Sequence, residues 1–199
     1  MGEPHQKDRR SPENPGAEAS ALDEKVLDVA LRLLSTRSRS VEELRTRLLK
    51  KGLSRPDVSD CLKWLQQRNY LDDEAFSRTL VRDRIRFSPR SPFLLRTELR
   101  NKGVAASLAG RAVTAVLEEE GISTFDLAVK AAESWVRKQS PSVRQDLVGL
   151  RFSPEREKAR RRLYGFLARR GFVGDEARTG MEAGEEEARR QVNPENGEA

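Results

Sequence analysis

Apolar residues recur at helical spacing along most of the chain. Val41, Leu44 and Leu48 follow one another at intervals of three and four residues, which places them on one face of a helix. Serine or aspartate precedes many such segments and glycine follows several, as expected of helix starts and stops. No segment alternates β-branched and polar residues as a strand would. The pattern predicts nine helices, at about 21–37, 41–51, 55–68, 73–87, 92–102, 106–120, 124–139, 154–170 and 174–187.

One helical segment occurs three times. The sequence ELRTRLLKKGL at 43–53 resembles LLRTELRNKGV at 94–104, at an offset of 51 residues. A third copy, RLYGFLARRGF at 162–172, follows the second at an offset of 68 and therefore contains 17 additional residues. Each copy ends in a glycine followed by an apolar residue that can pack back onto the helix. Self-similarity of this kind indicates a repeat architecture.

The repeats define the expected domain organisation. We predict an all-α fold, an elongated tandem array of three three-helix repeats, in which neighbouring repeats complete each other's small cores. The predicted repeats span 21–70, 71–121 and 122–187, and the additional residues form an inserted loop at about 139–153. Residues 1–20 and 188–199, which lack hydrophobic periodicity, are expected to be a disordered leader and a disordered tail.

Composition excludes several classes of protein. No apolar run approaches the roughly 20 residues of a membrane-spanning helix, and the N-terminus lacks the apolar core of a secretory signal. The chain has one cysteine, Cys61, and one histidine, His5, so a cysteine–histidine metal site or a serine–histidine–aspartate triad has too few ligands or catalytic groups. The expectation is a cytoplasmic protein that is not an enzyme and needs no cofactor or metal.

The net charge is unevenly distributed. The whole chain carries 38 Lys and Arg against 32 Asp and Glu, a formal charge of +6. The leader and the segment 176–199 are acidic, so residues 21–175 alone carry +11. Arginine outnumbers lysine by 29 to 9, and its planar guanidinium pairs well with phosphate and carboxylate. A long basic surface suits a polyanionic partner, although a compositional bias towards arginine would produce the same counts.

Three segments resemble landmarks of a known family, the RecX-family recombination regulators. They are ALRLLSTRSRSVEEL at 30–44, YLDDEAF at 70–76 and LARRGF at 167–172. Each is short, but together they occur in the family's order within three-helix repeats, and the resemblance covers about residues 25–175. It implies a monomeric regulator that binds the filament of RecA protein on single-stranded DNA and suppresses strand exchange and ATP hydrolysis. It also implies possible direct, non-specific binding of DNA.

Two arginine clusters are the candidate contacts to RecA or DNA. Arg78, Arg82 and Arg86 recur every four residues on one predicted helix, which makes a basic stripe, and Arg90 lies just beyond it. The second cluster surrounds the third glycine-terminated helix and comprises Arg160, Arg161, Arg162, Arg169 and Arg170. The alternative for both clusters is a solvated face that pairs with nearby acids such as Asp83, Glu155 and Glu157.

Two further questions stay open at this point. A short turn before the predicted helix 55–68 also fits an autonomous helix-turn-helix DNA-binding regulator, which would bind DNA sequence-specifically and usually as a dimer. Gly180 and Gly184 each cost the last predicted helix about 1 kcal/mol relative to alanine, which leaves the docking of that helix open.

Overall fold

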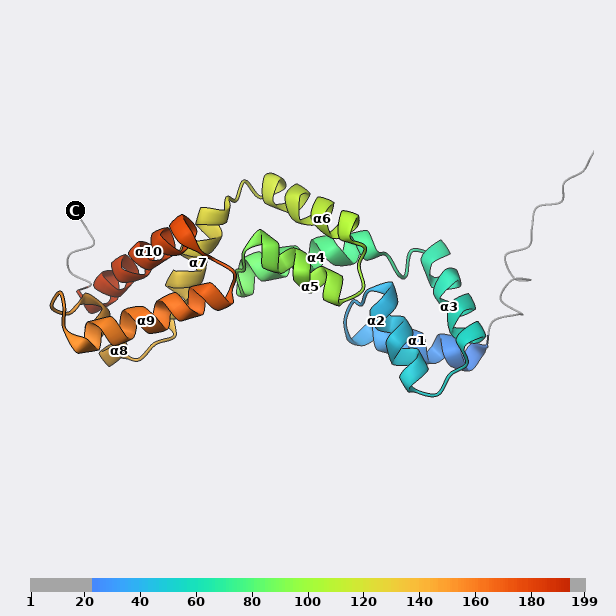
Figure 1. Cartoon of the computed structure of the whole chain (residues 1–199). Helices are drawn as coiled ribbons and strands as arrows, with labels where there is room; N and C mark the ends of the chain where they lie inside the picture. Colours follow the sequence, from blue (N-terminus) through green and yellow to red (C-terminus); the bar gives the residue numbers. More distant parts are fainter. Residues whose placement is uncertain (1–22, 194–199) are drawn as a thin grey trace, which may run out of the picture. The chain divides into compact units, whose positions relative to one another are not determined.

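A computed structural model describes residues 23–193 of the protein, and all regular secondary structure in this range is helical (Figure 1). The prediction of an all-α fold is therefore confirmed for the described residues. Ten helices are present there: α1 (Glu24–Thr36), α2 (Val41–Lys50), α3 (Arg55–Gln67), α4 (Asp73–Phe87), α5 (Pro92–Asn101), α6 (Ala106–Glu119), α7 (Thr124–Arg137), α8 (Pro141–Val148), α9 (Pro154–Arg169) and α10 (Gly174–Val192).

The chain divides into two compact units. Among the described residues, the first comprises 23–39 and Glu43–Leu71, and the second comprises Ser40–Glu42 and 72–193. The first unit buries one apolar face of each of its three helices. The buried apolar residues are Val26 and Ala30 on α1, Leu44 and Leu48 on α2, Val58, Cys61, Leu62 and Leu65 on α3, and Leu71.

The second unit has one continuous main core. Side chains of α4, α5 and α6 pack together with side chains of α7, α9 and α10. The three-helix sets α4–α6 and α7, α9 and α10 therefore complete each other's burial, as expected of neighbouring repeats that are individually too small. The largest fully buried side chains of this core are Leu95, Leu99, Leu127, Leu163, Leu167 and Phe172.

The predicted helix starts and stops are present in the second unit. The Ser91 hydroxyl accepts a hydrogen bond from the amide of Leu94 at 3.3 Å, and the Ser153 hydroxyl accepts one from Arg156 at 3.2 Å. Gly103 has a φ of 84°, in the left-handed region that glycine adopts without strain. The next amide, that of Val104, then donates to the carbonyl of Leu99 at 3.1 Å. These contacts stabilise the helix ends that the sequence pattern predicts.

The predicted inserted loop at 139–153 is wrong in its central part, because residues Pro141–Val148 form α8. Ser140 caps this helix, and Pro141 stands at its first turn, where proline is favoured. Leu147 is fully buried in a small cluster with Val136 and Ala159. A helix of eight residues is too short for its apolar residues to show a clear helical period in the sequence.

The last helix docks through the two glycines that weaken its propensity. A Cβ on Gly184 would lie 2.7 Å from the Leu163 side chain, and one on Gly180 would lie 3.2 Å from the backbone oxygen of Ala128. Both glycines therefore let α10 approach α7 and α9 closely. The helix continues to Val192, with Ala188 fully buried, so the predicted disordered tail is wrong for residues 188–192.

The predicted disordered leader, 1–20, and the end of the predicted tail, 194–199, lie outside the described residues. Of the helices between residues 23 and 193, none combines the length and apolar character needed to cross a membrane. The exact boundaries of the three repeats stay a prediction.

Candidate functional site

The first predicted arginine cluster does not form one free stripe. Arg78 donates two hydrogen bonds to the carboxylate of Glu119 on α6, at 2.6 and 2.7 Å. Arg82 reaches both Glu119, at 2.8 Å, and Glu120, at 3.2 Å. The hydrogen bond from Arg78 and the positive charges of both arginines lower the pKa of the Glu119 carboxyl. Arg78 and Arg82 therefore connect α4 to α6, which leaves less of their charge for a partner.

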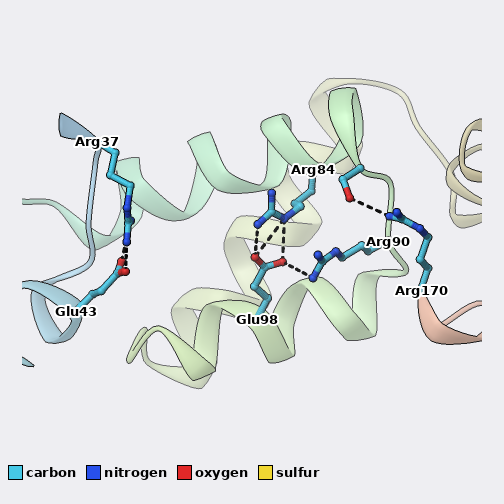
Figure 2. Close-up of polar contacts among 7 residues, drawn as sticks. Arg37, Glu43, Arg84, Arg90, Glu98 and Arg170 are labelled. Carbon is cyan, nitrogen blue, oxygen red and sulfur yellow. Dashed lines mark hydrogen bonds and ion pairs between the residues drawn. The ribbon is translucent and has the colours of Figure 1, made fainter. Parts of the chain in front are cut away.

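Glu98 gathers two further arginines inside the second unit, as Figure 2 shows. The guanidinium of Arg84 donates to both carboxylate oxygens, the shortest contact being 2.5 Å, and Arg90 donates at 3.0 Å. The Glu98 side chain is only 14% exposed. Arg90, predicted as a partner contact, is thus paired within the fold, and Arg84 is a structural residue that the sequence pattern did not single out.

The second predicted cluster is also partly paired. Arg160 and Arg156 on α9 both donate to the carboxylate of Glu185 on α10. Glu185 is 7% exposed, so the two arginines neutralise a buried acid and connect the two helices. The acids near α9 in sequence, Glu155 and Glu157, form no ion pair with Arg160.

Arg170 follows α9 directly and contacts the turn between α4 and α5 (Figure 2). Its guanidinium donates to the hydroxyl of Ser88 at 2.9 Å and to the carbonyl of Pro89 at 3.0 Å, and it lies over the ring of Phe166. Burial lowers the pKa of Arg170, and the nearby positive charges of Arg90 and Arg84 lower it further. Arg170 therefore joins two parts of the second unit, and the proline-containing turn provides its acceptors.

The remaining arginines of the second cluster line an open groove between α7 and α9, here called the α7–α9 groove. It has a volume of 490 Å³. Within the described part of the chain, no carboxylate lies within ion-pair distance of Lys158, Arg162 or Arg169, and none lines the groove. Arg161 donates to a backbone carbonyl of its own helix at 3.3 Å. The full lining is Trp135, Gln139, Lys158, Arg161, Arg162, Gly165 and Arg169.

A second groove, the α4–α7 groove, has a volume of 630 Å³ and carries both signs of charge. Its cations are Arg82, Arg86, Lys130 and Arg137, and its acids are Glu120 and Glu133. A hollow of 120 Å³ adjoins both grooves, because it shares Pro89 and Ser134 with one and Trp135 and Gln139 with the other. We call the two grooves and the adjoining hollow of the second unit, in whose lining cations outnumber acids, the basic trough.

The trough brings together parts of both predicted clusters. Arg86 contributes from α4, and Arg161, Arg162 and Arg169 contribute from α9. Four further cations line the trough that the sequence pattern does not single out: Lys130 and Arg137 on α7, Lys138 directly after it, and Lys158 on α9. In the sequence these four cations are interspersed with acidic residues and form no single cluster. They come together along the trough because α7 packs against its neighbouring helices.

The described residues contain no group of three or more histidine, cysteine or acidic side chains that could hold a metal ion. Cys61 is buried in the first unit, and burial raises the pKa of its thiol to about 11. A thiol with that pKa stays protonated near neutral pH and is a poor nucleophile.

Comparison with known proteins gives the family. Models of two RecX domains match the chain: the first three-helix domain at residues 27–65 and the second at residues 72–113. The regulatory protein RecX of Pelodictyon phaeoclathratiforme is 33% identical over 152 residues, which cover 76% of this chain and 84% of that protein. RecX of Halorhodospira halophila is 32% identical over 174 residues, covering 87% of this chain and 97% of that protein.

Solved structures show the same fold. The crystal structure of RecX from Lactobacillus salivarius aligns with a TM-score of 0.58 at 18% identity, covering 85% of this chain and 97% of that one. A second crystal structure of regulatory protein RecX aligns with a TM-score of 0.60 at 22% identity. The sequence matches, the tandem three-helix domains and the shared fold show that this chain belongs to the RecX family of regulatory proteins.

Proposed function

We propose that this protein binds the RecA nucleoprotein filament in the cytoplasm and inhibits or modulates RecA strand exchange and ATPase activity. Membership of the RecX family supports a regulatory role rather than a catalytic one. The basic trough supports a polyanionic partner. A filament of protein on single-stranded DNA offers phosphate groups and acidic side chains along its length, and both attract clustered cations.

The observation that carries the proposal is the α7–α9 groove. A cation already paired within the fold has little charge left for a partner, as Arg78 and Arg82 illustrate. Lys158, Arg162 and Arg169 line a hollow that has no carboxylate from residues 23–193 in its lining, so their charge is directed at whatever occupies the hollow. Cations that line a groove and have no acidic partner within the described fold make the groove electrostatically complementary to an anionic surface. They also speed the association with such a surface.

The test is a RecA strand-exchange assay combined with DNA-dependent ATP hydrolysis. We expect the wild-type protein to suppress both at amounts up to stoichiometric with RecA. The double variant Arg162→Glu/Arg169→Glu should need roughly 10-fold more protein for the same suppression, because it replaces attraction by repulsion in the groove. Both side chains are exposed, so the variant should fold normally.

The matched control is Arg96→Glu/Arg100→Glu, which makes the same change of charge on two exposed positions of α5 outside the trough. This control should suppress strand exchange nearly as well as the wild type. The proposed function is wrong if excess wild-type protein leaves both RecA activities unchanged. The assignment of the groove is wrong if the two double variants behave alike.

A second candidate function is direct, sequence-independent binding of DNA. The absence of carboxylates from the lining of the α7–α9 groove favours it, because a phosphate backbone needs only positive charge and hydrogen-bond donors. This candidate differs from an autonomous helix-turn-helix regulator, which would protect specific sequences in a footprint.

A further inference from the structure

The turn between α8 and α9 exposes two large apolar side chains. Leu150 is 84% exposed and Phe152 is 81% exposed, the highest values among the large hydrophobic residues that the structure describes. The amide of Ser153 donates to the carbonyl of Leu150 at 3.1 Å, which closes the turn. We call residues 149–153 the α8–α9 tip.

The tip is held between two anchored helices. On one side, Leu147 at the end of α8 is fully buried, in a cluster with Val136, Ala159 and Ala188. On the other side, the hydroxyl of Ser153 caps α9. The two exposed side chains therefore project from a turn whose ends are anchored in the second unit.

The fold itself does not explain the residues of the tip. Neither Leu150 nor Phe152 belongs to a buried cluster. Phe152 also has a φ of 73°, a conformation that is unfavourable for a bulky side chain and easy for glycine. A polar residue at 150 and a glycine at 152 would make a more soluble and less strained turn. Strained backbone of this kind clusters at binding sites.

Beside the tip lies one cation that is not paired within the described residues, Arg151, while Arg156 and Arg160 pair with Glu185. A hollow of 450 Å³ beside the tip is lined by Arg151, Phe152, Arg156, Glu157 and Arg160. Arg151 lies 5.3 Å from the centre of the Phe152 ring. Among the described residues, no carboxylate forms an ion pair with Arg151. The tip thus presents an apolar pair next to an unpaired cation.

We propose that the α8–α9 tip is a docking element that inserts Leu150 and Phe152 into an apolar pocket rimmed by carboxylates on a protein partner. Two apolar side chains suit a small protein pocket, whereas stable attachment to a membrane needs a larger apolar face. The α7–α9 groove and the hollow beside the tip are lined mainly by cations, so neither offers a second copy of this tip a pocket rimmed by carboxylates. The inference rests on the proposed function, in which the partner protein is RecA.

The experiment measures the affinity of the full-length protein for RecA filaments assembled on single-stranded DNA. The variant Leu150→Ser/Phe152→Gly should raise the Kd about 10-fold or more, because a few side chains buried in a partner's pocket carry most of the affinity of an interface. Its midpoint of thermal unfolding should not fall, since neither side chain is packed and glycine relieves the strained φ. The matched control is Phe93→Ser, which removes a 70% exposed aromatic side chain from α5 and should leave the Kd unchanged.

The outcomes separate the two proposals. If the wild type does not bind the filament, the proposed function is wrong. If the wild type binds and the tip variant binds equally well, the docking element is wrong and the proposed function stands. A photo-crosslinking amino acid at position 152 gives a second measurement, and we expect a crosslink to RecA protein. Crosslinking to DNA or to a second copy, or binding of the tip to anionic lipid vesicles in place of RecA, would overturn the inference.

Discussion

Glu98 shows how one carboxylate organises charges from different elements of the second unit. It lies on α5 and accepts hydrogen bonds from Arg84 on α4 and from Arg90 in the following turn. Burial by itself raises the pKa of the Glu98 carboxyl, but the hydrogen bonds from Arg84 and the charges of both arginines outweigh burial. The pKa therefore lies below its ordinary value of 4.5, and the ionised form stabilises the fold.

We expect Glu98→Gln to lower the free energy of unfolding by about 2 kcal/mol at pH 7, the cost of removing hydrogen bonds to a charged group. Since the pKa of Glu98 is depressed in the folded state, its contribution is fully present above pH 4.5 and is lost as the pH falls through the folded pKa. The difference between wild type and variant should therefore shrink below pH 4.5 in urea unfolding. A difference that stays constant from pH 7 to pH 3 would contradict this role.

At the scale of elements, the docking of α10 reverses the usual effect of glycine in a helix. Glycine weakens an isolated helix by about 1 kcal/mol relative to alanine. In α10, Gly184 faces the fully buried Leu163, and Gly180 faces Leu167 and a carbonyl of α7. The missing side chains allow close contact between helices, so the loss in propensity is offset by packing.

Gly184→Ala should therefore destabilise the second unit by about 1 kcal/mol, because overpacking of a buried site costs about 1–3 kcal/mol and exceeds the gain in propensity. Gly110→Ala is the matched control. A Cβ on Gly110, within α6, would meet nothing within 4 Å, so this change should stabilise by up to about 1 kcal/mol. Fluorescence of Trp135 in a Trp64→Phe background would follow the unfolding of the second unit alone. Equal stabilisation by both changes would exclude the packing role of Gly184.

For the molecule as a whole, the distribution of paired and unpaired cations decides the mode of binding. A net charge of +6 indicates a basic protein without locating the contact. Arg78 and Arg82 pair with acids of α6, while Arg162 and Arg169 do not pair with acids of the described chain. The α7–α9 groove is therefore one place where charge available to a polyanion is gathered.

This distribution predicts the salt dependence of DNA binding in the absence of RecA. Each contact to a single-strand phosphate contributes about 0.7 to the slope of log K against log salt. We expect Arg162→Ala/Arg169→Ala to reduce that slope by about 1.4, and Arg78→Ala/Arg82→Ala to change it little. Affinity titrations of a labelled oligonucleotide at several salt concentrations would measure both. Equal reductions by the two variants would show that the ion pairs with α6 do not withhold charge, and a sequence-specific footprint would favour the helix-turn-helix alternative.

The sequence by itself determined the features that depend on residues within one or two helical turns. Ser91 and Ser153 start helices, Gly103 ends one, and apolar spacing marks the buried faces, because caps and stops are made by neighbouring residues. The short landmarks were also sufficient to indicate the family. The same local signals were too weak to reveal α8 or the docking of α10.

Only the tertiary structure decided which cationic side chains are paired with acids inside the fold and which are left to contact a partner. Arg78 meets Glu119, and Arg160 meets Glu185, across 41 and 25 residues of sequence, and no helical spacing predicts such pairs. Helix packing also aligns Lys130 and Lys158 with the predicted arginines and leaves Leu150 and Phe152 exposed. Charge and spacing in the sequence identify a basic helical protein, whereas the partner-facing surface is decided by which side chains the packed helices pair, bury or leave free.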